Sequence, residues 1–411
     1  KQLSTMFSTI TTALATVTML SSSASAAELK VAQNGKAIFS QYLVRLNPDQ
    51  DVSALKAHIA EIKEALGADF ETLDLYENLG SKSFLGYAAK LSPAGLQLLL
   101  RNGKVMYVEE DQTVTLNDCQ QESDPDWGLA RTNYHNYDYT QTYTYDYTTG
   151  ATGAGVDAYI IDTGIYCEND DFTSKAVGTC TFGYSSVKNI FGVVDTTDGN
   201  GHGTHCAGSV AGQTYGVAKE ANLIAVKVMS DKGSGSTSNI ISGVNWVAGQ
   251  AKATGKPSVA NLSIGGGYSQ ANNDAIAGLV AAGVTASVAA GNDNSDACNY
   301  SPASEPTAIT VAATDKTNAR AYYSNYGSCC DVFGPGSNIT SAWIGSPSAT
   351  NTISGTSMAS PHVCGVAAKF LSANPAATPA DITAQILAEA SVGEITDTQG
   401  TPNLMVYGYC T

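Results

Sequence analysis

The stretch DAYIID, residues 157–162, is apolar between its two acidic ends and carries the aromatic and β-branched residues that strands favour. Four further apolar runs follow it along the chain: ANLIAVKVM (221–229), PSVANLSI (257–264), VTASVAA (284–290) and AITVAA (308–313). Segments with helical spacing of apolar residues separate them, as at 236–252 and 271–282. Apolar strands that alternate with helices predict an α/β fold in which helices cover both faces of a parallel sheet.

A different pattern precedes this region. Strands are predicted at 37–46, 70–76, 84–91 and 104–111, and helices at 51–66 and 92–100. The resulting order of strand, helix, strand, strand, helix, strand is that of a small α+β unit of the ferredoxin-like type. The polar stretch from Asp118 to Pro125 then predicts an exposed linker that proteases can reach.

The N-terminus and the composition indicate export. An apolar stretch from Phe7 to Leu20, too short to span a bilayer, precedes the small-residue pattern Ala24-Ser25-Ala26, so residues 1–26 are predicted to be a signal peptide. The net charge of −16 would repel nucleic-acid phosphates and anionic membrane surfaces, so neither is an expected partner. The nine cysteines imply disulfides in a secreted protein, which we expect to be a monomer.

Polar residues with catalytic potential follow several of the predicted strands. Asp162 ends the first strand, His202 follows a glycine-rich loop, and Asn292 follows the strand at 284–290. Ser357 lies in ISGTSMASPHVCG (353–365), at the expected start of a helix, where it could also be an ordinary N-cap. Because parallel strands deliver the residues at their carboxyl ends to one edge of a sheet, we expect these side chains to meet there.

Together these residue types suit acyl transfer. A serine hydroxyl becomes a nucleophile when an imidazole takes its proton, and a buried carboxylate holds that imidazole in the required tautomer. An asparagine side chain and a backbone N–H at a helix start can stabilise the oxyanion. The sequence therefore predicts Ser357 as nucleophile, His202 as base, Asp162 as the acid that orients it, and Asn292 as an oxyanion donor, with no cofactor needed for catalysis.

The motifs around these residues resemble those of the subtilases. Four segments are similar to the family's signatures: IIDTGI (160–165), NGHGTHCAG (200–208), VAAGN (288–292) and SGTSMASPH (354–362). The order Asp, His, Ser is also theirs, and differs from the orders of chymotrypsin and of the α/β-hydrolases. DWGLAR (126–131) and SIGGGYS (263–269) resemble the proteinase K branch. The resemblance implies a subtilisin-like fold and a serine endopeptidase acting on proteins and peptides.

The N-terminal unit resembles the inhibitor prodomain of the same family, with VMYVEEDQTV (105–114) as its closing strand. On this basis residues 27–119 are expected to form the prodomain and residues 120–411 the peptidase domain. The prodomain would occupy the cleft as an intramolecular inhibitor and be released by self-cleavage between Asn117 and Gln120.

The resemblance also implies a substrate site. Two backbone segments would hold an extended peptide as an added strand, which permits broad specificity: Gly233, Ser234 and Gly235, and Ser263, Ile264 and Gly265. Uncharged residues would line the pocket for the residue before the scissile bond, so that apolar or aromatic residues are preferred there: Ala289, Ala290, Gly291 and Tyr300.

Three structural features complete the expectations. The resemblance implies a structural Ca²⁺ held by the carbonyls of Pro306 and Ala308 and by the carboxylate of Asp331. It also implies a Cys298–Cys329 disulfide and a buried free thiol at Cys206. Cys167 and Cys180 are close in sequence and are expected to form a local bond.

Three other functions were weighed against the peptidase. An inactive homologue that only binds peptides would be expected to lack a triad residue, and none is missing. An esterase of the α/β-hydrolase type is disfavoured because the sequence has no G-x-S-x-G. A zinc site at HGTHC (202–206) is disfavoured because the glutamate of an H-E-x-x-H helix is absent.

Overall fold

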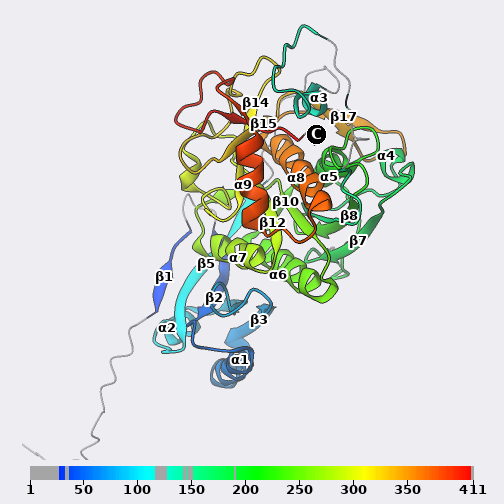
Figure 1. Cartoon of the computed structure of the whole chain (residues 1–411). Coiled ribbons are helices and arrows are strands. Elements are labelled where there is room, and N and C mark those ends of the chain that lie inside the picture. Colours follow the sequence, from blue (N-terminus) through cyan, green and yellow to red (C-terminus); the bar gives the residue numbers. More distant parts are fainter. Residues whose placement is uncertain are drawn as a thin grey trace, which may run out of the picture.

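The protein is described by a computed structural model that covers residues 27–32, 37–115, 127–141, 145, 151–188 and 191–408. The predicted signal peptide and the predicted cleavage segment from Asn117 to Gln120 lie outside these residues. Figure 1 shows a small N-terminal unit, coloured blue to cyan, packed against two green helices of a much larger unit.

The larger unit is built on a sheet with the strand order β18-β19-β15-β14-β12-β10-β6-β8-β7. The strands from β7 to β15 all pair in parallel, as predicted. Their bounds are β6 (Asp157–Asp162), β7 (Cys180–Ser185), β8 (Asn222–Lys227), β10 (Ser258–Leu262), β12 (Val284–Ala289), β14 (Ile309–Thr314) and β15 (Val332–Pro335), with β18 (Ser391–Val392) and β19 (Leu404–Met405) at one edge. The five predicted strands are all present, whereas β7 and β15 lack the long apolar runs that would have revealed them.

Helices cover both faces of this sheet. Alternate residues of β6 point to opposite faces, because side chains alternate along a strand. Ala158 and Ile160 join one core with α5 (His202–Ala211) and α8 (Thr356–Ala373), and Tyr159 and Ile161 join another with α6 (Thr237–Thr254) and α7 (Gln270–Ala281). Every residue of β6 is therefore buried, which explains why its sequence is apolar without alternation.

The N-terminal unit has the predicted ferredoxin-like order, and its sheet is arranged β1-β5-β2-β4-β3. The elements run β2 (Ala37–Leu46), α1 (Val52–Leu66), β3 (Phe70–Tyr76), β4 (Gly86–Leu91), α2 (Pro93–Leu100) and β5 (Val105–Thr115). The sequence did not predict β1 (Glu28–Lys30), which pairs in parallel with β5.

Both faces of this small sheet are covered, and by different parts of the chain. Val44 and Val108 face α1 and α2, while their neighbours Leu43 and Tyr107 join the core that contains α6 and α7 of the larger unit. Figure 1 shows the same arrangement, with α6 and α7 lying between the two sheets. The second face is apolar and depends on the larger unit for cover, so the two units bury surface jointly.

The remaining described elements are short and lie mainly in connections. They are α3 (Trp127–Arg131), α4 (Asp170–Thr173), α9 (Pro379–Glu389), β9 (Ser234–Ser236), β11 (Gly266–Gly267), β13 (Tyr300–Ser301), β16 (Ile339–Ala342), β17 (Thr350–Ile353), and the 3-10 turns η2 (Gly67–Asp69) and η3 (Ala297–Asn299). Among the helices of the described residues, none combines the length and apolar character needed to cross a bilayer.

Candidate active site

The four predicted catalytic residues lie at the ends of the elements that carry them. Asp162 is the last residue of β6, and His202 is the first residue of α5. Asn292 lies in the loop after β12, and Ser357 is the second residue of α8, behind the N-cap Gly355. Parallel strands and the helices that follow them thus bring side chains far apart in the sequence to one edge of the sheet.

Asp162 and His202 form a direct buried pair. Nδ1 of His202 lies 2.9 Å from Oδ1 and 3.0 Å from Oδ2 of Asp162. Burial acts most strongly and lowers the pKa of His202, but the Asp162 carboxylate and the Cys206 sulfur, with their hydrogen bonds, together hold that pKa well above its ordinary value. A base must be neutral to accept a proton, so this pair is suited to activity at alkaline pH.

Ser357 is fully buried beside this pair. Its Oγ donates a hydrogen bond to the carbonyl of Ser263 at 3.1 Å, while Nε2 of His202 is buried with no hydrogen-bond partner among the described residues. Cys206 contacts both residues, with Sγ 3.5 Å from the carbonyl oxygen of Ser357 and 3.9 Å from Nδ1 of His202. Base and nucleophile therefore share one site without being hydrogen-bonded to each other, a common feature of sites without bound substrate.

The side chain of Asn292 is oriented by the residue before the nucleophile. Its Oδ1 accepts hydrogen bonds from the backbone N–H and the hydroxyl of Thr356, both at 2.9 Å. A backbone N–H can only donate, so Oδ1 must face Thr356, and the amide NH₂ remains as a donor on the other side. The N–H of Ser357, in the first turn of α8, has no acceptor among the described residues and is a second donor for an oxyanion.

Gly291 allows this arrangement. Its φ of 104° is a left-handed conformation, and a Cβ at this position would come 2.3 Å from Nδ2 of Asn325. Its own N–H donates to the hydroxyl of Thr356 at 3.1 Å, which ties the loop after β12 to the start of α8. A larger residue here would clash with Asn325 and strain the loop that carries Asn292.

We predict that replacing Asn292 slows self-cleavage of the precursor by about 10²- to 10³-fold, the usual cost of losing one oxyanion donor. Asn292→Asp is the sharper variant, because it keeps the acceptor for Thr356 but cannot donate. The rate constant of self-cleavage measures the effect directly, with the exposed Asn374, at the end of α8, changed to alanine as the control. A loss below about threefold in Asn292→Asp would contradict the assignment.

The first predicted substrate-binding edge is occupied by the N-terminal unit. Strand β5 continues beyond its own sheet and pairs antiparallel with β9, with Thr113 opposite Ser236, Val114 opposite Gly235, and Thr115 opposite Ser234. Gly233 makes the turn before β9 with a φ of 72°. An extended backbone thus lies where the resemblance placed a peptide substrate, and the chain that continues from it lies outside the described residues.

The second predicted substrate-binding edge contacts Ser357 through Ser263. Ser263 follows β10 and bonds Ser357 through both its carbonyl and its hydroxyl, the latter at 2.7 Å to the Ser357 carbonyl oxygen. Ile264 is buried, and Gly265 lies against the carbonyl of Ser301.

Ala289 and Ala290, at the end of β12, are buried, whereas Tyr300 is half-buried in β13. Burial is the main cause of a raised pKa at Tyr300, and the nearby Asp293 carboxylate also raises it. The sequence analysis did not identify this acidic neighbour of the predicted pocket.

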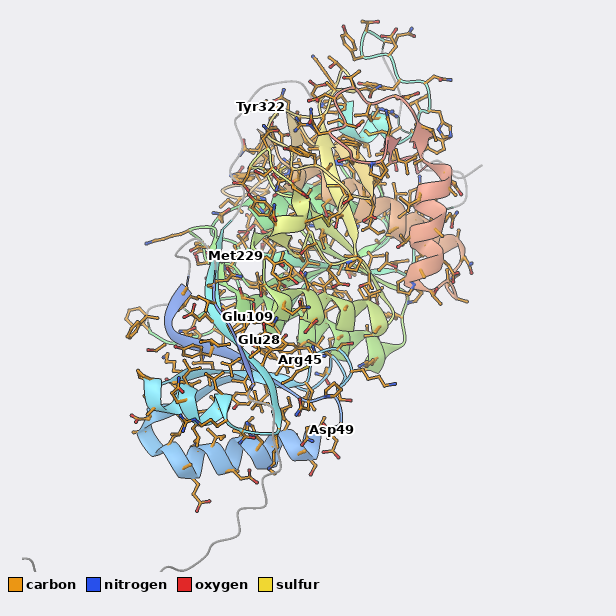
Figure 2. The ribbon with its side chains drawn as sticks, turned by 90° about the vertical axis from the view of Figure 1, so that its left-hand side faces the viewer. Glu28, Arg45, Asp49, Glu109, Met229 and Tyr322 are labelled. Atoms are coloured by element: carbon orange, nitrogen blue, oxygen red, sulfur yellow. A yellow bond between two sulfur atoms is a disulfide. The ribbon has the colours of Figure 1, made fainter. Side chains whose placement is uncertain are left out.

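Two carboxylates of β5 bind the N-termini of the helices beneath the prodomain. Glu109 accepts hydrogen bonds from the Ser269 hydroxyl and from the N–H of Ala271 at 2.9 Å, at the start of α7. Asp111 accepts from the hydroxyl and the N–H of Ser238, the latter at 3.0 Å, at the start of α6. Figure 2 shows Glu109 where the two units meet. Negative charge is favourable at helix N-termini, so these contacts orient β5 on the larger unit.

Burial raises the pKa of Glu109 to about 7 and that of Asp111 to about 6, although their hydrogen bonds act in the opposite direction. In a released prodomain these groups would return toward ordinary carboxyl values. Docking therefore takes up protons, so that docking is strongest at low pH and weakens as the pH rises through the pKa values of the docked state.

We predict that the dissociation constant of the cleaved prodomain rises at least about tenfold between about pH 5 and about pH 8. Recovery of peptidase activity on dilution of the self-cleaved protein measures it. The Glu109→Gln/Asp111→Asn variant should lose most of this pH dependence, whereas Glu110→Gln, which lies between them, should keep it. Affinity that is constant or increases toward pH 8 would show that these carboxyl groups do not control docking.

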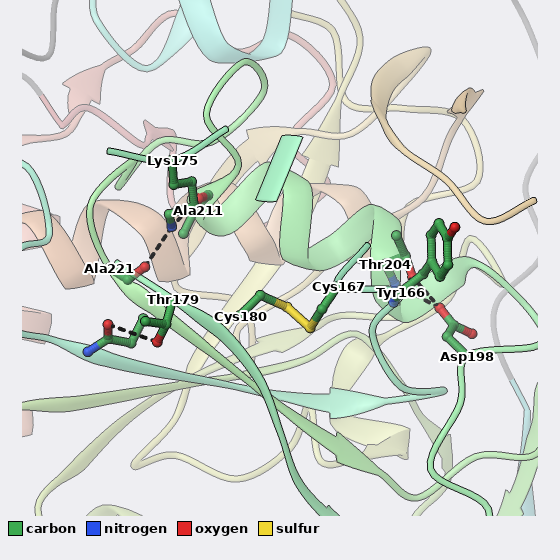
Figure 3. The surroundings of a disulfide bond; sticks show 10 residues. Tyr166, Cys167, Lys175, Thr179, Cys180, Asp198, Thr204, Ala211 and Ala221 are labelled. Carbon is green, nitrogen blue, oxygen red and sulfur yellow. Dashed lines mark hydrogen bonds between the residues drawn. A yellow bond between two sulfur atoms is a disulfide. The ribbon is translucent and has the colours of Figure 1, made fainter. Parts of the chain in front are cut away.

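Two disulfides lie within the part of the chain that the structure describes. Cys167 is bonded to Cys180, and Cys298 to Cys329. Figure 3 shows the first bond beside the segment that follows Asp162, where the N–H of Tyr166 donates to the hydroxyl of Thr204 at 2.9 Å. Among the described cysteines three are free and buried: Cys206, Cys330 and Cys364.

The predicted calcium ligands lie in the segments that lead into two neighbouring strands. Asp331 directly precedes β15, and Pro306 and Ala308 precede the neighbouring strand β14. Oδ2 of Asp331 accepts the N–H of Thr310 at 2.7 Å, and burial raises the pKa of Asp331 to about 6. No cationic side chain of the described residues forms an ion pair with it. A half-buried acid without a cationic partner fits the oxygen ligands that Ca²⁺ prefers.

The two other histidines near the site are not bases. His205 bonds the carbonyl of Ile339 through Nε2, and His362 bonds that of Met358 through Nδ1. Burial lowers their pKa values to about 3 and about 4, so both remain neutral. The described residues contain one cluster with metal-binding potential, Asp162, His202 and Cys206, and the hydrogen bonds of the Asp–His pair account for it.

The sequence analysis missed several residues that hold the site together. Thr356 orients Asn292, and the carboxylates of Glu109 and Asp111 position β5. EED (109–111) contains three consecutive acids, of which the first and third lie on one face of a strand, and this is the sequence signal that could have indicated the helix contacts. No signal in the sequence indicated that Ser263 would bond both the hydroxyl and the carbonyl of Ser357.

The site combines a buried Asp–His pair with a serine at the carboxyl edge of a parallel sheet. Strand β5 of the N-terminal unit pairs with the adjoining backbone of β9. This combination defines the subtilisin-like class of serine peptidases. The family model described as "Subtilase family" matches residues 153–409, and the one described as "Peptidase inhibitor I9" matches residues 41–117. The chain belongs to the subtilase family and carries an I9 inhibitor prodomain.

Known proteins support this assignment over most of the chain. A "Cuticle-degrading serine protease" of Arthrobotrys oligospora is 44% identical over 385 residues, which are 91% of this chain and 91% of the relative. "Alkaline serine exoprotease A" of Vibrio alginolyticus is 45% identical over 80% of this chain and 60% of its own length. A solved "cold adapted subtilisin-like serine proteinase" superposes with a TM-score of 0.62 at 43% identity, covering 70% of this chain and all of that one.

Proposed function

We propose that this subtilase is a secreted endopeptidase whose prodomain blocks the site until the chain cleaves itself between Asn117 and Gln120. The observation that carries the proposal is the antiparallel pairing of β5 with β9, because the backbone of the N-terminal unit then occupies the predicted substrate edge. An intact Asp162–His202 pair disfavours the alternative, an inactive homologue that only binds peptides.

The geometry supports a specific role for each catalytic residue. Oγ of Ser357 attacks the scissile carbonyl while Nε2 of His202 accepts its proton, and Asp162 stabilises the resulting imidazolium. Asn292 and the N–H of Ser357 donate to the oxyanion. The imidazolium then protonates the leaving amine, and a water molecule repeats these steps to release the acyl group.

Substrate choice follows from what the site offers. Backbone donors and acceptors at Gly233 to Gly235 and at Ser263 to Gly265 bind any extended peptide, which favours broad specificity. The small apolar side chains of Ala289 and Ala290 leave room for an apolar or aromatic residue before the scissile bond. The exposed Asp293 near Tyr300 is the feature most able to modify this preference.

One experiment tests the proposal as a whole. The full-length protein is allowed to mature, is incubated with casein with and without a fluorophosphonate, and the new termini in casein are identified by mass spectrometry. We expect one fluorophosphonate adduct, on Ser357, complete inhibition, and apolar or aromatic residues before most cleaved bonds. A strict preference for arginine or lysine would overturn the specificity, and absence of an adduct would overturn the catalytic assignment.

Secretion and the monomeric state are part of the proposal. The small-residue pattern ending at Ala26 supports export, and the net charge of −16 suits a soluble extracellular protein. Recovery of the mature protein from the culture medium, eluting as a single chain on gel filtration, is the expected result.

We further propose that Asp331, with the carbonyls of Pro306 and Ala308, holds a structural Ca²⁺. A bound cation would neutralise the carboxylate and link the loops before β14 and β15. None of the three proposed ligands hydrogen-bonds Asp162, His202 or Ser357, so the ion would act on stability rather than on the chemistry.

We predict that chelation lowers the melting temperature of the fluorophosphonate-inhibited enzyme by about 5–10 °C, the shift expected for loss of an ion at about 100 times its dissociation constant. Asp331→Asn should melt lower and no longer respond to chelator. A wild-type melting temperature that ignores chelator would rule out the site. Inhibition of the enzyme beforehand prevents self-digestion from imitating the effect.

A further inference from the structure

One lysine is buried in the sheet next to the catalytic pair. Lys227 is the last residue of β8, has no exposed surface, and lies directly opposite Asp162 in the register of β6 and β8. A charged group is costly to bury unless it is paired and hydrogen-bonded. Its partners therefore indicate what this lysine does.

The ammonium of Lys227 joins three separate segments. Nζ donates to the carbonyl of Thr163, the residue after Asp162, at 2.8 Å. It also donates to Oδ1 of Asp231 at 2.8 Å and lies 3.6 Å from Oδ2 of Asp195 in the loop that precedes His202. Thr163 follows the catalytic acid Asp162, Asp195 lies in the loop before the base His202, and Asp231 lies in the turn that follows β8.

A chain of hydrogen bonds continues from Asp231 to the base. Oδ1 of Asp231 accepts the N–H of Gly199 at 3.2 Å, and its carbonyl accepts from the side chain of Asn200 at 3.0 Å. Oδ1 of Asn200 in turn accepts the N–H of His202 at 3.2 Å. Gly199 lies so close that an added Cβ would come 2.4 Å from the Asp231 carboxyl group. The position of His202 thus depends on the partner that Lys227 holds.

The acid is fixed at the other end of the same network. The carbonyl of Asp162 accepts the N–H groups of Val228 at 2.8 Å and Met229 at 3.1 Å, the two residues after Lys227. The hydroxyl of Thr163 accepts the N–H of Gly203 at 2.9 Å, beside His202. Lys227 is therefore the point at which the supports of Asp162 and His202 meet.

We propose that Lys227 is a positioning residue for the Asp162–His202 pair: its ammonium holds the end of β6 and the approach to α5 in the relative placement that the proton transfer requires. The inference rests on the proposed function. Lys227 does not touch the reacting atoms, so it acts through Thr163 and Asp231.

The charges around Lys227 and His202 predict a second effect of removing the lysine, on the pH dependence of activity. Lys227 faces the carboxylates of Asp195 and Asp231, and His202 faces Asp162 and the thiol of Cys206. Loss of the lysine charge leaves the two carboxylates uncompensated, which favours the imidazolium form of His202. The acid limb of the kcat/KM profile should then move to higher pH, whereas loss of the Asp231 charge should not move it upward.

The test compares Lys227→Met with a matched buried lysine in the full-length, self-maturing protein. Lys219 is also almost fully buried, and it donates to the carbonyls of Gln213 and Thr214 rather than to the site. Active sites are titrated with a fluorophosphonate, and kcat, KM and the pH profile are measured on a short peptide substrate. We expect Lys227→Met to lower kcat per titrated site by at least about tenfold, to raise KM less than about threefold, and to shift the acid limb upward. Lys219→Met should lower the melting temperature only.

The proposal is overturned if Lys227→Met has an unchanged kcat and an unmoved acid limb. With a lowered melting temperature as in Lys219→Met, this result would mean that Lys227 has only a structural role. If Lys227→Met does not fold, Asp231→Asn decides, because Asp231 is half exposed and its replacement leaves no cavity. If Asp231→Asn has a lower kcat and its acid limb does not move to higher pH, the proposal is supported. If Asp231→Asn has an unchanged kcat, the proposal is overturned. Wild-type protein that is neither labelled nor active would instead refute the proposed function.

Discussion

Ser357→Ala is expected to remain a full-length precursor and to hydrolyse no casein, while wild-type protein converts to a smaller, active form. The hydroxyl is the only group at this position able to form an acyl-enzyme, and loss of the nucleophile in a catalytic triad costs on the order of 10⁶ in kcat. Since self-cleavage uses the same chemistry, its rate constant should fall by a similar factor. Gel electrophoresis over time, with sequencing of the new N-terminus, measures both effects.

A matched control distinguishes lost chemistry from lost folding. Ser360 is also buried in α8, and its hydroxyl donates to Oδ1 of Asn261 rather than to the site. Ser360→Ala should therefore mature, with at most a modest loss of stability. A Ser357→Ala/His202→Ala double variant should be no slower than either single variant, because the two residues act as a unit. Normal maturation of purified Ser357→Ala would refute the nucleophile assignment.

The second large effect is expected from Asp162→Asn, at on the order of 10⁴ in the rate of self-cleavage. Oδ1 of Asp162 accepts the N–H of Thr163 at 2.7 Å as well as bonding Nδ1 of His202. An asparagine keeps its oxygen toward Thr163, so its NH₂ takes the place of Oδ2, which lies 3.0 Å from Nδ1. The imidazole must then carry its proton on Nε2, where it cannot accept the proton of Ser357.

The pH profile provides an independent measure of the same change. The Asp162 carboxylate raises the pKa of His202 against the effect of burial, so its removal lets burial lower that pKa. The acid limb of the residual kcat/KM should therefore move to lower pH, even though the rate falls. An unmoved limb, with an unchanged melting temperature, would show that Asp162 does not interact with the imidazole in solution.

The prodomain binds the peptidase domain through more than the substrate edge. Arg45 and Tyr107 both bond Oδ2 of Asp274 on α7, at 2.6 Å and 2.8 Å, and the apolar face of the small sheet lies on α6 and α7. Affinity is thus spread over a buried face remote from Ser357. The strand β5 then contributes its backbone to the substrate edge.

Much of this molecule follows from the sequence, because the signals are local. The five central strands are buried on both faces and hence apolar throughout, and the helices between them show clear periodicity. The strands β7 and β15 were missed because β7 is largely exposed or half-buried and β15 has four residues including a glycine and a proline. Short strands of this kind form only because a neighbouring strand offers its backbone.

The sequence by itself determined the fold class, the prodomain and the identity of the four residues on which catalysis is proposed to depend, since motif order and strand-end positions can be read along the chain. Tertiary structure alone decided how these residues are held. Three sets of contacts between distant segments do this. Thr356 orients Asn292, and Glu109 and Asp111 bind two helix N-termini. Lys227 is buried between Thr163, Asp195 and Asp231. Such contacts depend on which distant segment each side chain meets, and strand register and helix packing decide this only in the folded chain.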